Sequence, residues 1–172
     1  MFKAQQKTKE PENFDKAYDY AVFLLSLQLR TTGEVEKKME GRGYGHEIIA
    51  DVVRQLKGQK YLDDQSYAEV YLENLKKYKN FGYYGIKKKF MEKRLPTEII
   101  EKILANRLPV EEEIKIAKRL LKKEGFAVKT KSANEETQYR TFDEESAKQK
   151  QKLAQKLKAR GFRGEVIAKL VF

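Results

Sequence analysis

The sequence contains no cysteine and a single histidine among 172 residues. The absence of cysteine excludes disulfides, thiolate metal sites and a cysteine nucleophile, and it is consistent with a cytosolic protein. One histidine, His46, cannot supply a histidine-rich zinc site and gives little support to a His-based catalytic triad. The sequence therefore gives little support to an enzyme that uses thiol, zinc or imidazole chemistry.

Long apolar runs are also missing. The longest runs from Ala21 to Leu25, far short of the roughly 20 residues that cross a bilayer. The first residues, MFKAQQKTKEPENF, are polar and do not resemble a secretory signal. We therefore expect a soluble, basic, cytoplasmic protein that has no membrane partner and acts as a monomer.

Positive charge is abundant and unevenly distributed. The chain has 37 Lys+Arg and 26 Asp+Glu, which gives a net charge of +11. Residues 76–94, the first basic segment, hold eight basic and one acidic residue (+7), and residues 148–172, the second basic segment, hold the same numbers (+7). Residues 1–75 (−2) and 95–147 (−1) account for the remainder. Charge concentrated in this way favours contact surfaces for an anionic partner, although Lys-rich helices can also simply expose lysine to water.

Three stretches share one pattern of apolar residues, related by offsets of 51 and then 67 positions. The matching residues are Val35, Met39, Tyr44, Ile48, Ile49, Val52 and Val53; Ile86, Phe90, Leu95, Ile99, Ile100, Ile103 and Leu104; and Leu153, Leu157, Phe162, Val166, Ile167, Leu170 and Val171. Spacings of three and four place such residues on one face of a helix, and the gap inside each copy supplies a turn. Each copy is therefore predicted to form two helices joined by a tight turn, the first copy opened by a Thr31–Glu34 capping box.

An additional helix precedes each copy. Ala17 and Leu24 match Ala68 and Leu75 at the offset of 51, and a third version follows 49 positions later. Because the offset grows from 49 to 67 within the third copy, 67 − 49 = 18 residues are inserted between the helix ending near position 121 and the next. The polar stretch near residues 125–145 is the natural place for this insertion.

The predicted fold is therefore all-α, with three tandem three-helix, helix-turn-helix-like repeats that form an elongated, curved body. The predicted boundaries are an N-terminal tail (1–13), repeat 1 (14–62), repeat 2 (63–108) and repeat 3 with its insertion (109–172).

Candidate catalytic or metal-binding residues are few. Asp63 and Asp64 are interpreted as helix-capping carboxylates, with a Mg²⁺ or Ca²⁺ ligand pair as the alternative. The acidic run at 111–113 follows Pro109 and is explained by the first turn of a helix. No set of acid, base and nucleophile can be assembled, so we predict no enzymatic activity, no cofactor and no metal.

The most distinctive local feature is the mixture of lysines and aromatics at residues 76–85. Aromatic rings among lysines can stack on nucleic-acid bases, or they can fill a corner between helices. Ile86 and Phe90 are expected to face the core and leave the following cations on the outer surface. The candidate partner- or DNA-binding cations are Lys76, Lys77, Lys79, Lys87, Lys88, Lys89, Lys93, Arg94, Lys152, Lys156, Lys158, Arg160 and Arg163. The candidate aromatic contacts are Phe81, Tyr83 and Tyr84.

Three motifs in this order resemble the RecX family of bacterial recombination regulators. The segment 58–68, GQKYLDDQSYA, is similar to the family's Tyr-Leu-Asp-Asp-x-x-Tyr-Ala signature. Phe81-Gly82, followed by Ile86 and Phe90, resembles its Lys-Gly-x-x-x-Ile-x-x-x-Leu stretch. The segment 158–162, KARGF, resembles its Arg-Arg-Gly-Phe turn. The resemblance covers about residues 14–172 and agrees with the three-repeat plan.

This resemblance implies a non-enzymatic modulator of the RecA recombinase, with a role in recombination, repair and the SOS response. Such proteins lie along the groove of the RecA–DNA filament and inhibit its ATPase and strand exchange. The implied partners are the RecA filament and single- or double-stranded DNA. Two other hypotheses remain open: a stand-alone DNA-binding protein that uses its repeats as helix-turn-helix modules, and a helical scaffold for an acidic partner.

Overall fold

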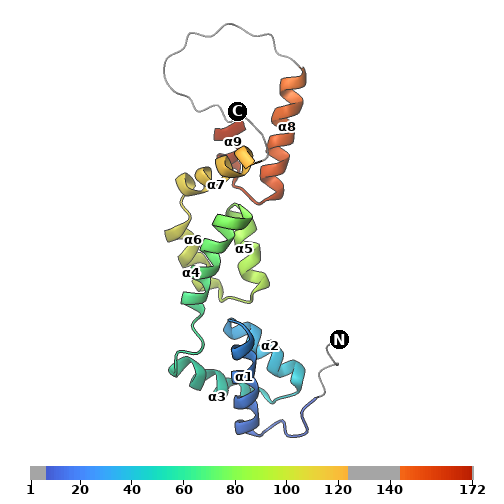
Figure 1. Cartoon of the computed structure of the whole chain (residues 1–172), viewed down its shortest axis with the longest axis vertical. Coiled ribbons are helices and arrows are strands. Elements are labelled where there is room, and N and C mark those ends of the chain that lie inside the picture. The colour runs from blue at the N-terminus through green and yellow to red at the C-terminus, as the bar shows by residue number, and fades with distance from the viewer. Residues whose placement is uncertain (1–6, 124–143, 172) are drawn as a thin grey trace. The chain divides into compact units, whose positions relative to one another are not determined.

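A computed structural model describes residues 7–123 and 144–171. Within these ranges the chain is helical and contains no β-strand. The helices are α1 (Phe14–Leu27), α2 (Thr32–Arg42), α3 (His46–Gly58), α4 (Asp64–Asn74), α5 (Tyr83–Glu92), α6 (Thr97–Arg107), α7 (Val110–Lys123), α8 (Glu144–Ala159) and α9 (Gly164–Val171), with a π-helical turn, Leu75–Lys79, after α4 (Figure 1). The predicted all-α fold of three-helix repeats is confirmed.

The first triplet shows how one repeat is built. Helices α1, α2 and α3 pack against one another around a common core (Figure 1). Ala17 and Ala21 on α1, Met39 on α2 and Leu56 on α3 are fully buried there. The small residues on α1 let the neighbouring helices approach closely, and the hydroxyl of Tyr44 donates to the carbonyl of Lys16 at 3.1 Å.

The repeated apolar pattern corresponds to the buried faces of the second and third helices of each triplet. Every position of the pattern is buried or half-buried. The predicted capping box is also present, because Thr31 Oγ1 accepts from the Glu34 amide at 3.1 Å and Glu34 Oε2 accepts from the Thr31 amide at 3.3 Å. Gly43 ends α2 with φ = 92°, a left-handed conformation that favours glycine.

The chain divides into two compact units. The first unit comprises the residues up to Tyr71 together with Phe90–Glu101, and the second comprises Leu72–Lys89 together with the chain from Lys102 onward. The division passes through the second triplet, so α4, α5 and α6 each contribute to both units. The repeat boundaries and the elongated, curved body remain predictions, and most of the insertion near 125–145 lies outside the described residues.

In the first unit, the start of α2 is joined to elements of the second triplet by polar contacts. The Thr32 amide donates to Asp64 Oδ1 at 2.8 Å, and Asp64 is only 6% exposed. Thr31 Oγ1 donates to the Lys93 carbonyl at 2.5 Å. A Cβ on Gly33 would lie 2.7 Å from the Arg94 carbonyl oxygen, so glycine permits this close approach.

The second unit contains the corresponding junction between α5 and the third triplet. The Tyr83 amide donates to Oε1 of Glu113, a fully buried residue, at 3.0 Å. The Gly82 amide donates to the Arg160 carbonyl at 3.0 Å, and the Tyr84 amide donates to the Gly161 carbonyl at 2.8 Å.

These two junctions use equivalent positions. Tyr83 lies 51 residues after Thr32, the same offset that relates the second helices of repeats 1 and 2. Glu113 lies 49 residues after Asp64, the same offset that relates the first helices of repeats 2 and 3. The acceptor carbonyls belong to Lys93 and Arg160, which differ by the third offset, 67. A buried carboxylate in the first turn of one repeat therefore caps the second helix of the repeat before it.

The corresponding turn of the first triplet has a different partner. The carbonyl of Arg42, which lies 51 residues before Lys93, accepts from the Thr8 amide at 2.7 Å. The Gly45 amide donates to the Pro11 carbonyl at 3.1 Å. Residues 7–12 thus cover the α2–α3 turn. In the later repeats the equivalent turn is covered by the start of the second helix of the preceding repeat.

The close approach at the second junction predicts opposite effects for two glycine substitutions. A Cβ on Gly82 would collide with the Cα of Phe162, so Gly82→Ala should lower the free energy of unfolding by about 1–3 kcal/mol. Gly41 lies within α2 with open space around it, so Gly41→Ala should raise that free energy by about 0.5–1 kcal/mol. Urea unfolding followed by circular dichroism measures both, and equal changes would contradict the tight junction.

Candidate polyanion-binding surface

The first basic segment begins where the regular helix α4 changes its geometry. Leu75–Lys79 form a π-helical turn, and Asn80 follows in a left-handed conformation with φ = 50°. Asn80 is only 6% exposed, and its Oδ1 has no hydrogen-bond partner in the part of the chain that the structure describes. Such turns are often found at functional sites, because they redirect the side chains that follow them.

The second basic segment meets the first within the second unit. Besides the backbone bonds from Gly82 and Tyr84, Arg160 Nη1 donates to the Lys79 carbonyl at 2.9 Å. The Arg160 guanidinium also lies 5.5 Å from the centre of the Phe81 ring, a cation–π distance. The α8–α9 turn therefore packs directly on the start of α5, and the two cationic segments come together at one junction.

Arg163 has an internal role at this junction. Its Nε lies 2.5 Å from Oε2 of the buried Glu113, and its amide donates to Glu113 Oε1 at 2.9 Å. Its Nη2 donates to the Leu108 carbonyl at 3.1 Å. Glu113 therefore compensates the arginine charge and caps α5 at the same time, a role beyond the first-turn explanation that the sequence supports.

Two other predicted contact residues also form ion pairs. The Lys76 side chain is 12% exposed and contacts Glu73 at 3.1 Å and Glu112 at 3.4 Å. Burial raises the pKa of Glu112, but Lys76 and Lys115 outweigh it and hold that pKa below its usual value. Lys93 Nζ lies 2.9 Å from Glu34 Oε1, and this hydrogen bond raises the pKa of Lys93. Lys93 is half-buried, and its ammonium group is engaged by Glu34 instead of being free at the outer surface.

The other predicted cations differ in exposure. Six are exposed: Lys77, Lys79, Lys88, Arg94, Lys152 and Lys158. Three are half-buried and make contacts of their own: Lys87, Lys89 and Lys156. Ile86 and Phe90 are fully buried, as expected from the stripe on α5. The exposed cations are the ones available to an external polyanion.

The predicted aromatic contacts divide in the same way. Phe81 lies against Arg160, and the Tyr83 ring lies 4.9 Å from the Arg163 guanidinium, so both help to fill the corner between helices. Tyr84 is 59% exposed, and Tyr78, which the prediction of individual contacts omitted, is 62% exposed. These two tyrosines are the rings of the segment that an external base or side chain can reach.

The two adjacent aspartates have separate structural roles. Asp63 accepts from the Ser66 hydroxyl at 2.6 Å and from its amide at 3.0 Å, and these bonds lower the pKa of Asp63. Asp64 is occupied by the Thr32 amide. Hydrogen bonding thus accounts for both carboxylates as caps. Among the described residues, no group of three His, Cys, Asp or Glu is placed to hold a metal ion.

Sequence reasoning also missed cations outside the two basic segments. Arg30, Lys37 and Lys38 line a cleft in the first unit together with Arg94. They escaped notice because glutamates at positions 34, 36 and 40 alternate with them and cancel the local charge. Only the fold brings these cations to one place.

Within the described residues, no helix combines the length and the apolar character needed to cross a membrane.

Comparison with known proteins agrees with the motifs. The family model described as RecX, first three-helix domain, matches residues 17–56. The chain is 30% identical over 160 residues to the regulatory protein RecX of Bacillus licheniformis, covering 91% of this chain and 53% of that one. It is 28% identical over 153 residues to the regulatory protein RecX of Geobacillus kaustophilus, covering 89% and 52%.

The chain is similar to RecX proteins over about nine tenths of its length. The resemblance inferred from the YLDD, Phe-Gly and Arg-Gly-Phe motifs is thereby confirmed. The chain spans about half the length of the curated RecX relatives it matches. The crystal structure of RecX from Lactobacillus salivarius has a similar fold, with a TM-score of 0.67 at 24% identity over 91% of this chain and 92% of that one.

Removing the buried carboxylate of the second junction should destabilise the chain. Glu113→Ala leaves the Arg163 guanidinium and the Tyr83 amide without their acceptor, and loss of one partner of a buried pair costs about 3–5 kcal/mol. Glu111→Ala is the matched control, because Glu111 is exposed in the same first turn and should change stability by less than about 0.5 kcal/mol. Urea unfolding followed by circular dichroism compares the two. Equal effects would show that Glu113 acts only as a first-turn charge.

The capping role of Asp63 predicts an effect that depends on pH. Asp63→Ala should lower the free energy of unfolding by about 1 kcal/mol at neutral pH, whereas Asp63→Asn should retain most of the cap. Because the folded-state pKa of Asp63 is lowered, its ionised form contributes above the ordinary aspartate pKa. This contribution is lost as the pH falls through the folded-state value. Thermal unfolding between pH 2 and pH 7 tests this, and a Mg²⁺-dependent rise in Tm confined to the wild type would favour the metal hypothesis.

Proposed function

We propose that this chain is a non-enzymatic regulator that binds the RecA–DNA filament and inhibits its ATPase and strand exchange. Similarity to RecX proteins supports a regulatory role, since these relatives are named regulatory proteins. RecA as the partner follows from what the resemblance implies. The contact between the two basic segments in the second unit is the structural observation on which the proposal rests.

The proposed contact surface consists of cations that the fold leaves exposed around this contact. Lys77 and Lys79 are exposed on the π-helical turn, Lys88 is exposed on α5, and Lys152 and Lys158 are exposed on α8. Their ammonium groups suit either DNA phosphates or an acidic protein surface. Because Lys76, Lys93 and Arg163 serve the fold, the surface depends on fewer residues than the sequence alone suggests.

The exposed faces of the third helices argue against the helix-turn-helix alternative. A helix that enters the major groove needs basic and amide side chains on its exposed face and few carboxylates. The exposed carboxylates are Glu47 and Asp51 on α3, Glu98 and Glu101 on α6, and Glu165 on α9, and they stand among exposed basic and amide side chains such as Arg54, Gln55, Lys102, Asn106 and Lys169. These carboxylates would face phosphates or base edges in that arrangement, so we favour the filament regulator.

Reversing the charge of exposed lysines in the first basic segment tests the proposed surface. We expect the variant Lys77→Glu, Lys79→Glu, Lys88→Glu to inhibit RecA-driven ATP hydrolysis on single-stranded DNA at least about tenfold less strongly. Three attractive charges become repulsive, and a loss of about 1.4 kcal/mol of binding free energy already weakens binding tenfold. The matched control Lys57→Glu, Lys102→Glu, Lys122→Glu changes the same charge at exposed positions elsewhere and should inhibit normally.

Co-sedimentation with preformed RecA–DNA filaments, and a mobility shift on naked DNA, separate the hypotheses. Binding to filaments that is lost in the first variant and retained in the control supports the proposal. Tight, sequence-selective binding to duplex DNA without RecA would instead favour the helix-turn-helix alternative. Failure to bind either filaments or DNA at physiological salt would leave the scaffold for an acidic partner.

A further inference from the structure

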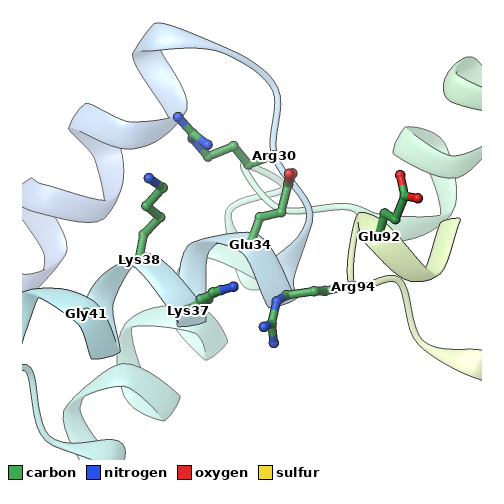
Figure 2. Close-up of a pocket in the computed structure, with 7 residues that line it drawn as sticks. All are labelled: Arg30, Glu34, Lys37, Lys38, Gly41, Glu92 and Arg94. Carbon is green, nitrogen blue, oxygen red and sulfur yellow. The ribbon is translucent and has the colours of Figure 1, made fainter. Parts of the chain in front are cut away.

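The first unit contains a cleft, and none of its lining residues takes part in the contact between the two basic segments in the second unit. Its volume is about 400 Å³, within the range of small-ligand sites. It is lined by the α1–α2 connection, helix α2, and the end of α5 with the turn that follows it (Figure 2). The lining residues are Arg30, Glu34, Lys37, Lys38, Gly41, Glu92 and Arg94. Apart from the glycine, every lining side chain is charged.

Like charges face one another inside this cleft. Figure 2 shows the side chains of Lys37 and Arg94 pointing toward each other, and those of Arg30 and Lys38 doing so at the other end. Lys37, Lys38 and Arg94 form no ion pair within the described residues. Cations that converge without a counter-ion repel one another, and an anion between them would remove that repulsion.

The two carboxylates of the cleft do not supply that anion. Glu34 is already engaged, because its Oε1 pairs with Lys93 at 2.9 Å and its Oε2 accepts from the Thr31 amide at 3.3 Å. Glu92 points away from the four cations in Figure 2. The positive charge of the cleft is therefore left to an external partner.

The fold positions the guanidinium of Arg30 and the backbone of Arg94 before any ligand arrives. Arg30 is anchored by its Nε, which donates to the Leu24 carbonyl at 3.2 Å. Arg94 has a left-handed backbone with φ = 55° and packs against Gly33 at the first junction. An anchored guanidinium such as that of Arg30 loses less entropy on binding, and the planar donors of a guanidinium match the oxygens of a phosphate.

We propose that this cleft binds phosphate groups of a nucleic-acid strand, without regard to base sequence. Phosphodiester oxygens match two guanidinium and two ammonium groups, and nucleic-acid interfaces are polar and strongly positive. A protein partner would instead favour an apolar centre with few charges, and no apolar or aromatic side chain lines the cleft. Without a ring for base stacking, contact is restricted to the backbone of the strand.

This site does not depend on the proposed regulation of RecA. It lies in the first unit, and three of its four cations, Arg30, Lys37 and Lys38, belong to neither basic segment. Its test therefore uses the full chain without recombinase. If the strand-binding test fails, the proposed regulation of RecA still stands, because that proposal is tested with a different variant and a different measurement.

Fluorescence anisotropy with labelled oligothymidylate and oligoadenylate strands measures the proposed contact. We expect the variant Lys37→Gln, Lys38→Gln, Arg94→Gln to bind both strands at least about tenfold more weakly. The slope of the logarithm of the binding constant against the logarithm of salt concentration should also become shallower by about two, roughly 0.7 for each phosphate that is no longer neutralised. The matched control Arg54→Gln, Lys57→Gln, Lys60→Gln removes three exposed cations of the same unit, including one with positive φ. It should bind within about twofold of the wild type.

Two competitors identify the source of the oxyanion. A strand that displaces the probe far better than inorganic phosphate or a polyglutamate peptide supports the proposal. Binding of phosphate alone in the cleft, with strand affinity unchanged by the cleft variant, would overturn it. So would a polyglutamate peptide that requires the cleft more than the strand does, or equal losses in the cleft variant and the control.

Amide chemical shifts of the unmodified chain give a readout that needs no variant. Gly41 lines the cleft, whereas Gly58 lies at the end of α3 outside it. Titration with oligothymidylate should shift the Gly41 amide resonance and leave that of Gly58 in place. A shift of Gly58 alone, or of neither, would overturn the proposed site.

Discussion

The structure depends on a buried carboxylate that each later repeat offers to the repeat before it. Asp64 accepts the Thr32 amide, and Glu113 accepts the Tyr83 amide, at 2.8 Å and 3.0 Å. The amides at the start of a helix have no partner within the helix, and burial would make their loss costly. A carboxylate of the following repeat satisfies them and also complements the positive end of the helix dipole. One contact thus couples neighbouring repeats and completes a helix.

This coupling explains why the cations of the basic segments have two kinds of role. The turn that follows the second helix of a repeat must approach the previous repeat so closely that only glycine fits at Gly33 and Gly82. Basic residues on that turn then lie beside carboxylates, and Lys93 and Arg163 form pairs with Glu34 and Glu113. Cations that point away from the junction, such as Lys88, remain exposed. The high positive charge of a basic segment therefore includes both cations that are paired at the junction and cations that are exposed beside it.

The helices could be predicted from the sequence, because apolar spacing and capping are local signals. Met39, Phe90 and Leu157 are fully buried as their repeated pattern predicts. The pairing of charges could not be predicted in the same way, since Glu113 and Arg163 are 50 positions apart and nothing local links them. The cleft could not be predicted for a related reason: its lysines alternate with glutamates along α2, and only packing of the α5–α6 turn brings Arg94 into the same cleft.

The polar residues of the junctions repeat less strictly than the apolar ones, and the backbone explains the difference. The equivalent carbonyls of Arg42, Lys93 and Arg160 accept from the Thr8 amide, the Thr31 hydroxyl and the Gly82 amide, respectively. Because the acceptor is a main-chain group and two of its three donors are too, the side chains at these places can vary without loss of the bond. The junction then depends on glycine for the close approach and on the buried carboxylate for the cap. The exposed positions around it are left free to acquire the charges that meet a partner.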